Sequence, residues 1–286
     1  MSAVILDSKP LVELLENNVK DAMQARRSIG LNHPARLAIL TDHSDEACEV
    51  YMKRKVKAAE RCGMEANVIA IPEKYDTEKV DYFMDKINKK YDAIILQLPV
   101  KDGKLKDAII ARIPPMKDVD GLGAENTYWI YSGRNPLHGP CTPQAICKLL
   151  IHYNIPLAGK HVVIVGRSYL VGRPLAEMML QADATVTVCH SKTEDLASIT
   201  RTADIIVSAA GCPNLITADM VKPGAAVVDV GINRVNGKLV GDVDFENVKE
   251  VAGYITPVPG GVGPVTVATL MLETARAACV VKAVMN

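Results

Sequence analysis

The chain has 286 residues, which is more than one average domain and about the length of two. Lysine plus arginine equal aspartate plus glutamate at 33 each, and only 4% of residues are aromatic, so the basic charge and stacking side chains typical of nucleic-acid binders are absent. Without a C-x-x-C pair, a signal-peptide pattern or an apolar run long enough to span a membrane, the sequence predicts a cytoplasmic protein with reduced thiols, no metal site and no membrane partner.

The first half of the chain is expected to alternate between amphipathic helices and buried strands. Apolar residues recur at i, i+3 and i+4 over residues 9–27, as on the buried face of a helix. Asp76 is placed to cap a later helix. The expected order is helix 9–27, strand 36–40, helix 44–63, strand 66–71, helix 77–90 and strand 91–98. Such alternation is typical of a mostly parallel sheet with helices on its faces.

Residues 112–142 lack this periodicity and are rich in proline and glycine, so we expect a long functional loop that leads to a second α/β series. Thr142 is expected to cap the next helix, with Pro143 in its first position. The second series comprises strands 161–166, 184–189, 204–208 and 225–230, helices near 171–181 and 193–200, and a last helix at 264–284. The sequence therefore predicts an α/β protein with two α/β domains.

A glycine-containing turn, GRSYLVGRP at residues 166–174, joins a predicted strand to a predicted helix. The first amides of a helix lack intrahelical partners and carry partial positive charge, so they suit a phosphate group. Gly166 permits a tight turn and Gly172 a close approach, while Arg167 and Ser168 can add donors. Because the spacing differs from G-x-G-x-x-G, an ordinary strand-to-helix loop is the alternative.

The end of the next predicted strand indicates which dinucleotide binds. NAD-binding folds place an acidic residue there, about 20 residues after the glycine turn, for the ribose 2′-hydroxyl. Here the strand is followed by His190, Ser191 and Lys192, and the first acid is Glu194. A hydroxyl together with a cation suits a 2′-phosphate, so NADP is favoured over NAD. A solvated loop is the alternative interpretation of His190 and Lys192.

Lys55 departs from the basic face of its predicted helix. Met52, Ala59 and Cys62 share its face, as does Tyr51 one turn earlier, so the lysine falls within an apolar stripe. Burial disfavours the ammonium form and lowers the pKa of a lysine, which suits a general acid or base near neutral pH. The alternative is a lysine whose charged end extends past the core to water.

Gln97 and Asp120 are polar residues in places where ligands bind. Gln97 ends an apolar strand, at the carboxyl edge where open α/β sheets bind ligands. Asp120 lies in the glycine-containing segment PMKDVDGLG, residues 115–123. An amide and a carboxylate can recognise a ring that bears amino and carbonyl groups. A capped strand end and ordinary turn chemistry are the alternatives.

Together these segments resemble the bifunctional methylenetetrahydrofolate dehydrogenase/methenyltetrahydrofolate cyclohydrolase (FolD) family over nearly the whole chain. The resemblance rests on the order and spacing of YMKRK, LQLPV, PMKDVDGLG, PCTP, VGRSYLVGRP, VTVCHSK, VVDVGIN and TPVPGGVGPVTVATLM. It implies a folate-binding catalytic domain at residues 1–141 and an NADP-binding domain at 142–263 with a Rossmann-like doubly wound parallel sheet. A C-terminal helix, 264–286, is implied to return to the first domain.

The resemblance also implies two reactions: oxidation of 5,10-methylenetetrahydrofolate with NADP, and hydrolysis of the resulting 5,10-methenyltetrahydrofolate to 10-formyltetrahydrofolate. The implied catalytic residues are Lys55, Tyr51, Gln97 and Asp120, with Tyr51 orienting the folate, Gln97 supporting Lys55 and Asp120 holding the pterin. The implied substrate-binding residues are Tyr51, Gln97, Leu98, Pro99, Asp120, Gly260, Gly261 and Pro264. The implied cofactor-binding residues are Thr142, Gly166, Arg167, Ser168, Val171, Gly172, Pro174, His190, Ser191, Lys192, Ala210, Gly231 and Ile232. Tetrahydrofolate derivatives are the implied partners of a homodimer that binds neither nucleic acid nor membrane.

The sequence departs from the family pattern at a few positions. Cys48 stands where the family usually has serine, Thr41-Asp42 replace a Val-Gly pair, and Tyr128 replaces a common glycine. Three alternative functions remain open: the same fold with only the dehydrogenase activity, another two-domain NADP dehydrogenase acting on a shikimate-like acid, and a non-catalytic dinucleotide sensor. The last needs no lysine in the apolar stripe.

Overall fold

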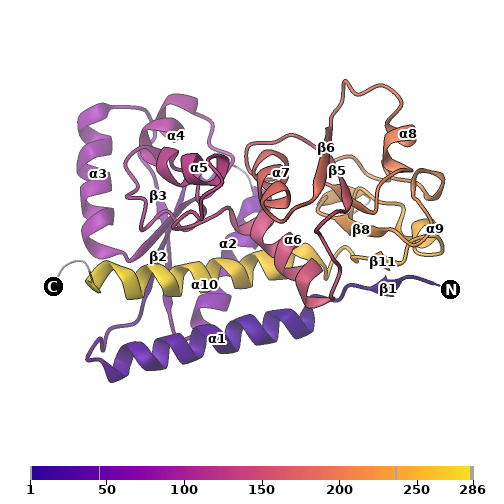
Figure 1. Cartoon of the computed structure of the whole chain (residues 1–286). Coiled ribbons are helices and arrows are strands. Elements are labelled where there is room, and N and C mark those ends of the chain that lie inside the picture. Colours follow the sequence, from indigo (N-terminus) through magenta and orange to yellow (C-terminus); the bar gives the residue numbers. More distant parts are fainter. Residues whose placement is uncertain (1, 45, 236, 284–286) are drawn as a thin grey trace. The chain divides into compact units, whose positions relative to one another are not determined.

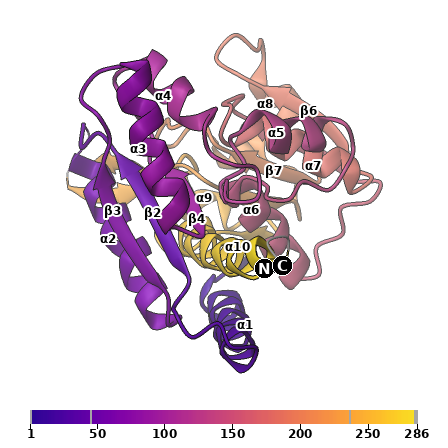
Figure 2. The same cartoon turned by 90° about the vertical axis from the view of Figure 1, so that its left-hand side faces the viewer.

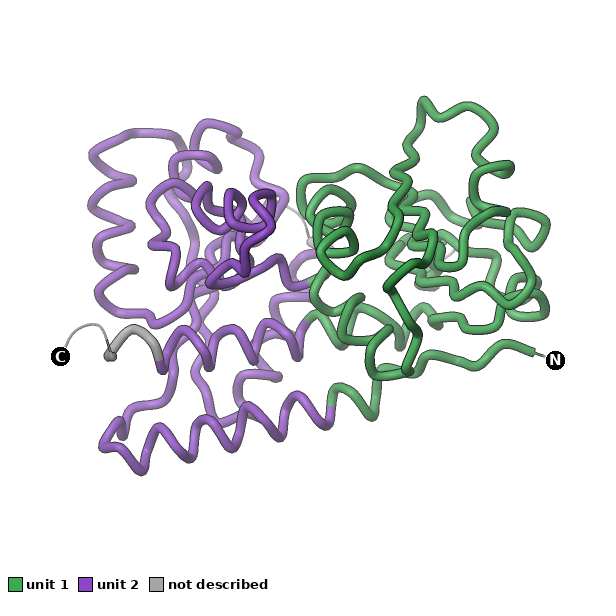
Figure 3. Tube along the Cα trace, in the orientation of Figure 1, with its two compact units in different colours: residues 1–12, 142–266 green, residues 13–141, 267–286 purple. Residues whose placement is uncertain are grey.

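The computed structural model describes residues 2–44, 46–235 and 237–283. The chain forms two compact units, which Figure 3 shows in different colours. Unit 1 comprises residues 1–12 and 142–266, and unit 2 comprises residues 13–141 and 267–286.

A parallel sheet of three strands forms the centre of unit 2 (Figure 1). Its order is β3 (Glu65–Ala70), β2 (Arg36–Thr41) and β4 (Ala93–Leu96). Leu37 of β2 lies opposite both Ala66 and Ala93. All residues of β2 except Arg36 are buried, whereas β3 at the edge has no buried residue. The apolar run after Arg36 therefore becomes a central strand that is buried on both faces.

Different helices cover the two faces of this sheet (Figures 1 and 2). Leu37 and Ile39 pack in a core with α1 (Lys9–Ser28), α2 (Glu46–Arg61) and α10 (Val262–Ala283). Ala38 and Leu40 pack in a second core with α3 (Thr77–Lys90) and α4 (Gly103–Ile110). Helix α10 lies beside α1, where Nε of Arg26 donates to the carbonyl of Ala278 at 3.4 Å. The predicted return of the C-terminal helix to the first α/β series is confirmed.

Two short helices of unit 2 were not predicted. Asp102 caps α4 by accepting hydrogen bonds from the amides of Lys104 and Leu105. Helix α5 (Ala124–Tyr131) lies inside the segment expected to be one long loop, so that prediction is wrong there. The amide of Gly123, just before α5, donates to the carboxylate of Asp118 at 2.7 Å. This hydrogen bond is made by a turn residue that precedes the helix. Such a contact produces no apolar periodicity in the sequence, so α5 could not be predicted from it.

Unit 1 contains a parallel sheet of six strands in the order β1 (Val4–Ile5), β11 (Tyr254–Ile255), β8 (Ala226–Asp229), β7 (Ile205–Ser208), β5 (His161–Val165) and β6 (Thr185–Cys189). The chain adds β6 on one side of β5 and β7 on the other. Open α/β sheets bind ligands beyond the carboxyl ends of the strands at such a reversal of direction. The predicted α/β fold with a Rossmann-like doubly wound sheet is confirmed.

Residues 1–12 lie in unit 1 because β1 pairs in parallel with β11. The expected division placed these residues in the first domain. Strands of two residues, such as β1 and β11, are too short to show an alternating pattern and were not predicted. The hairpin of β9 (Asn233–Val235) and β10 (Lys238–Val240) was missed for the same reason.

The helices of unit 1 are α6 (Cys141–His152), α7 (Gly172–Gln181), α8 (Leu196–Thr200), α9 (Phe245–Val248) and the short 3₁₀ helix η1 (Ala218–Met220). Helix α6 begins at Cys141, two residues before the expected first position at Pro143, so Thr142 lies in its first turn and does not cap it. Within the described ranges, no helix has both the length and the apolar character needed to cross a membrane.

Candidate active site

Lys55 and Gln97 meet at the carboxyl edge of the unit 2 sheet. Lys55 lies on α2, and its Nζ donates to Oε1 of Gln97 at 2.8 Å. Gln97 directly follows β4, and its backbone amide donates to the carbonyl of Leu40 in β2 at 2.8 Å. Met52 and Ala59, on the same face of α2 as Lys55, are buried as predicted. The helix and the strand end therefore hold the amine and the amide together.

Burial lowers the pKa of Lys55 below the usual value for a lysine. The negative charge of Asp120 acts in the opposite direction, followed by the effects of Cys141 and Cys48. Gln97 holds the nitrogen without adding charge. A lysine in this setting can exchange a proton with a bound molecule at a pH nearer neutrality than a solvated lysine can.

Cys48 fixes the orientation of the Gln97 amide. Nε2 of Gln97 donates to the carbonyl of Leu98 at 3.0 Å and to Sγ of Cys48 at 3.8 Å. The thiol of Cys48 donates to the same carbonyl at 3.4 Å. With its NH₂ group engaged in this way, Gln97 presents its oxygen to Lys55. Cys48, which replaces the usual serine of the family pattern, thus retains a hydrogen-bonding role beside the lysine.

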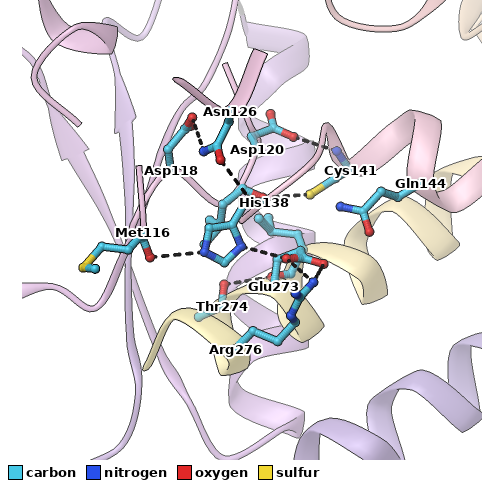
Figure 4. Close-up of polar contacts among 12 residues, drawn as sticks. Met116, Asp118, Asp120, Asn126, His138, Cys141, Gln144, Glu273, Thr274 and Arg276 are labelled. Atoms are coloured by element: carbon cyan, nitrogen blue, oxygen red, sulfur yellow. Dashed lines mark hydrogen bonds and ion pairs between the residues drawn. The ribbon is translucent and has the colours of Figure 1, made fainter. Parts of the chain in front are cut away.

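Asp118 and Asp120 have different surroundings (Figure 4). Asp118 is buried and accepts hydrogen bonds from the amides of Leu122 and Gly123 and from Nδ2 of Asn126, at 3.2, 2.7 and 3.1 Å. Burial raises its pKa. Asp120 is half-buried, and Oδ1 accepts from the amide of Cys141 at 3.1 Å. Asp118 therefore organises the turn, whereas Asp120 keeps oxygen lone pairs that can bind a ligand.

The other predicted substrate-binding residues fall in both units. Tyr51 is half-buried one turn before Lys55, with Cζ of Arg54 5.7 Å from its ring centroid. Leu98 and Pro99 follow Gln97, and the peptide bond between them is cis. Unit 2 therefore brings together Tyr51, Lys55, Gln97, Leu98, Pro99 and Asp120. Gly260, Gly261 and Pro264 lie in unit 1.

The turn after β5 in unit 1 is packed so closely that only glycine fits at two positions. A Cβ at Gly166, which has a φ of 126°, would lie 2.3 Å from the carbonyl oxygen of Ala209. A Cβ at Gly172 would lie 2.0 Å from the carbonyl oxygen of Gly166. Helix α7 begins at Gly172, and its N-cap residue, Val171, makes no side-chain hydrogen bond to the helix. Pro174 has no amide and the amide of Arg173 donates to the carbonyl of Ser168 at 3.1 Å, so the amide of Gly172 is the group at this helix end that is placed to meet a phosphate.

The remaining predicted cofactor residues of the sheet follow the carboxyl ends of β6, β7 and β8. Ser191 and Lys192, after β6, are exposed, and the amide of Lys192 donates to Nδ1 of His190 at 3.1 Å. The sheet order brings the turns after its adjacent strands to one edge, and they carry Gly166, Arg167, Ser168, Val171, Gly172, Pro174, His190, Ser191, Lys192, Ala210, Gly231 and Ile232. Thr142 lies apart from this series, in the first turn of α6.

A buried carboxylate that no sequence pattern singled out connects two of these turns. Oδ2 of Asp242 accepts from the amides of Ala210 and Gly211, at 2.7 and 3.1 Å, and from the hydroxyl of Ser208 at 3.2 Å. Its Oδ1 accepts from the amide of Cys212 at 2.9 Å and from Nδ2 of Asn233 at 3.0 Å. Asp242 is fully buried and so fixes the turn after β7 to the segment after β8.

Asp229 supports Asp242 in turn. Its carboxylate accepts from the amides of Gly231, Asp242 and Val243, each at 2.9 Å. Burial raises the pKa of Asp229 to about 6. A Cβ at Gly231 would lie 2.1 Å from Oδ1 of Asp242, so glycine is required there. In the sequence, Asp229 and Asp242 each appear only as an aspartate close to a glycine after a strand. That pattern is too common to identify them.

Comparisons with known proteins match nearly the whole chain. The family model "Tetrahydrofolate dehydrogenase/cyclohydrolase, catalytic domain" matches residues 6–120, and the corresponding "NAD(P)-binding domain" matches residues 140–282. A "Bifunctional protein FolD" of Paraburkholderia phytofirmans is 45% identical over 281 residues, which are 97% of each chain. A crystal structure of the FolD enzyme of Campylobacter jejuni is 43% identical with a TM-score of 0.92, covering 97% of this chain and 99% of that one. The Trypanosoma brucei enzyme, complexed with NADP cofactor and inhibitor, is 34% identical with a TM-score of 0.91 and full coverage of both chains.

Proposed function

Because the chain belongs to the tetrahydrofolate dehydrogenase/cyclohydrolase family, we propose that it oxidises 5,10-methylenetetrahydrofolate with NADP and hydrolyses the product to 10-formyltetrahydrofolate. The resemblance predicted from the sequence is confirmed by the family models. The observation that carries the proposal is the half-buried Lys55, which donates to Gln97 beside Asp120. This arrangement suits a site that binds a folate and moves a proton.

Unit 1 is the part of the chain that we assign to NADP. The residues fit the cofactor, since the backbone packing at Gly166 and Gly172 leaves room for no side chain and the amide of Gly172, at the start of α7, faces no side-chain cap. Ser191 and Lys192 would take the 2′-phosphate through a hydroxyl and a cation. Asp242 would hold the turn at Ala210 in place for the cofactor. When bound, NADP supplies the acceptor for the hydride that leaves the folate.

Unit 2 is the part that we assign to the folate. Asp120 would accept hydrogen bonds from the amino and ring nitrogen groups of the pterin, since a carboxylate has oxygen acceptors that match paired donors. Tyr51 would orient the folate by packing against it from the turn before Lys55. Leu98 and Pro99 would line the same side. Gly260, Gly261 and Pro264, which lie in unit 1, are the remaining residues that the family resemblance implies for the folate. These contacts place the one-carbon group for oxidation and keep it in place for hydrolysis.

Lys55 would act as the base in the hydrolysis. The methenyl compound is cationic, and an ammonium group beside it would be repelled. A neutral Lys55, favoured by burial, can accept a proton from water as the water oxygen bonds to the methenyl carbon. The bond from that carbon to N5 then breaks with protonation of N5, while the new hydroxyl loses its proton and becomes the formyl oxygen. Gln97 keeps Nζ in position during these proton transfers without adding charge.

A chain with the dehydrogenase activity alone is the second candidate, motivated by Cys48 in place of the usual serine. The hydrogen bonds of Cys48 argue against it, because the thiol still orients Gln97 toward Lys55. A non-catalytic sensor would leave the amine of Lys55 without a role. Both activities are therefore the better proposal.

We assign this enzyme to the cytoplasm and to a homodimer, as the family resemblance implies. Strand β6 lies at the edge of the unit 1 sheet, and its Val188 is 38% exposed. An edge strand of this kind can pair with a second copy. Light scattering coupled to size-exclusion chromatography measures the mass directly, and a monomer at micromolar concentration would rule out the dimer.

The test of the function is a rate measurement with purified protein, 5,10-methylenetetrahydrofolate and either NADP or NAD. We expect the methenyl absorbance to rise and then decay to the formyl product, with a lower KM for NADP than for NAD. Absence of folate turnover with both dinucleotides would refute the proposal. Accumulation of the methenyl compound without enzyme-dependent decay would instead support the dehydrogenase-only candidate.

A further inference from the structure

A buried histidine–glutamate pair in unit 2 joins the segment before α6 to helix α10. His138 and Glu273 are only 4% and 1% exposed, and Nδ1 of His138 lies 2.7 Å from Oε2 of Glu273 (Figure 4). Removing two such groups from water is costly, and a pair of apolar residues is often at least as stabilising. Stability alone is therefore a weak explanation for this pair.

Both ring nitrogens of His138 face oxygen acceptors. Nε2 lies 3.1 Å from the carbonyl oxygen of Met116, which can only accept a hydrogen bond. On the other side, Glu273 also accepts from Nη1 of Arg276, at 3.0 and 3.2 Å to its two oxygens, as a carboxylate does. The ring satisfies both neighbours when it carries two protons and donates from each nitrogen. His138 thus ties Met116 to α10 through two directed hydrogen bonds.

The segment that His138 begins is also the support of Asp120. The amide of Cys141 donates to Oδ1 of Asp120 at 3.1 Å, and the thiol of Cys141 donates to the carbonyl of Val119 at 3.3 Å. Gly121 packs so tightly on this segment that a Cβ there would lie 2.7 Å from the carbonyl oxygen of His138. Movement of residues 138–141 would therefore move Asp120.

A second route connects His138 to the same turn. Its backbone amide donates to Oδ1 of Asn126 at 3.3 Å. Nδ2 of Asn126 donates to Asp118 at 3.1 Å and to the carbonyl of Pro115 at 3.0 Å. Figure 4 shows His138 between this group and Glu273 of α10. The ring and the backbone of one histidine therefore fix both ends of the turn that carries Asp120.

We propose that His138 and Glu273 are positioning residues that clamp the Asp120 turn to α10 and thereby set the affinity of the site for its folate. This inference deepens the proposed function and rests on it for the identity of the ligand. Neither residue is assigned a contact with substrate or cofactor. Their effect is transmitted through Met116 and the 138–141 segment to Asp120.

The experiment compares Glu273→Gln, which removes the charge of the carboxylate, with Arg276→Met, which removes only its ion-pair partner on the same helix. Arg276 is more than half exposed, so its replacement removes the outer ion pair and leaves the bond between His138 and Glu273. We expect Glu273→Gln to raise the KM for methylenetetrahydrofolate about tenfold, the loss of one charge-assisted hydrogen bond, with the KM for NADP within about twofold of wild type. Arg276→Met should leave both KM values within about twofold of wild type.

Amide hydrogen exchange of Cys141 provides a readout that does not depend on activity. In Glu273→Gln the Cys141 amide should exchange at least about tenfold faster than in wild type, because its bond to Asp120 is loosened. His138→Gln serves as the second variant and should give the same pattern if Glu273→Gln fails to fold. Equal KM values in Glu273→Gln and Arg276→Met, or a lower Tm with unchanged folate KM and unchanged exchange, would overturn the inference. If the wild type turned over no folate, the proposed function would fail, while the exchange of Cys141 would still decide whether the pair positions Asp120.

Discussion

Replacement of Asp242 by asparagine is expected to weaken NADP binding and destabilise the protein together. The carboxylate accepts bonds from the amides of Ala210, Gly211 and Cys212, from the hydroxyl of Ser208 and from Nδ2 of Asn233. An asparagine keeps one oxygen. If that oxygen faces Ala210 and Gly211, the new NH₂ group faces two other donors, the Cys212 amide and Asn233.

The magnitude follows from those two donors. A fully buried donor left without an acceptor costs about 1–3 kcal/mol, and these two are partly buried, so Asp242→Asn should lower the free energy of unfolding by at most about 2–6 kcal/mol. That is a large part of the ~5–15 kcal/mol by which a typical domain is stable. The turn at Ala210 would also shift. A displacement of about 1 Å in an active site can lower the reaction rate by up to about 100-fold. We therefore expect the KM for NADP to rise at least about tenfold.

The assays are urea unfolding and initial rates with each substrate varied. Asp219→Asn is the matched control, because Asp219 lies in the same unit with a 71% exposed side chain in an ion pair with Arg201. That surface pair should contribute less than about 1 kcal/mol. The reasoning about Asp242 would be refuted by an unfolding free energy within about 1 kcal/mol of wild type together with an unchanged KM for NADP.

Three further predictions concern unit 1. Gly172→Ala should raise the KM for NADP at least about tenfold in initial-rate assays, because its Cβ would lie 2.0 Å from the carbonyl oxygen of Gly166. Gly103→Ala is the control: its Cβ would meet no heavy atom within 4 Å, so the KM for NADP should stay at the wild-type value. Lys192→Ala should raise the KM for NADP about tenfold and leave that for NAD unchanged, and an equal rise for both would contradict the 2′-phosphate assignment. Asp229 has a pKa raised from 3.8 to about 6, so its protonated form stabilises the fold fully below about pH 4 and this contribution is lost as the pH rises through 6. Relative to Asp229→Asn, the wild type should therefore lose about 3 kcal/mol of unfolding free energy between pH 4 and 7, and parallel pH curves in denaturant titrations would be the contrary result.

The strand and helix periodicities predicted most of the architecture. The apolar run at residues 36–40 became the central strand β2, and the periodic segment at 9–27 became α1. The short elements escaped because they carry no periodic signal. Strands β1 and β11 have two residues each, and α5 is held by a side chain from the preceding turn.

For the site, local patterns found the groups that stand out chemically from their neighbours. Lys55 was identified because it interrupts an apolar stripe, and Gln97 because it ends an apolar strand; the structure joins them by a hydrogen bond of 2.8 Å. The residues that hold the site were missed because their partners are distant in sequence. His138 bonds Glu273, 135 residues away, and Asp242 bonds the amide of Ala210, 32 residues away. No local pattern encodes such pairs.

The fate of the methenyl compound in Lys55→Met shows most directly whether Lys55 is the base of the hydrolysis. Stopped-flow absorbance would follow decay of 5,10-methenyltetrahydrofolate mixed with wild type, Lys55→Met and, as control, Lys57→Met, an exposed lysine on the same helix. We expect Lys55→Met to slow the enzymatic hydrolysis about 100- to 10,000-fold, the usual contribution of a general base, and Lys57→Met to hydrolyse the compound like the wild type. Hydrolysis by Lys55→Met at the wild-type rate would show that Lys55 is not the base and would contradict the proposed mechanism.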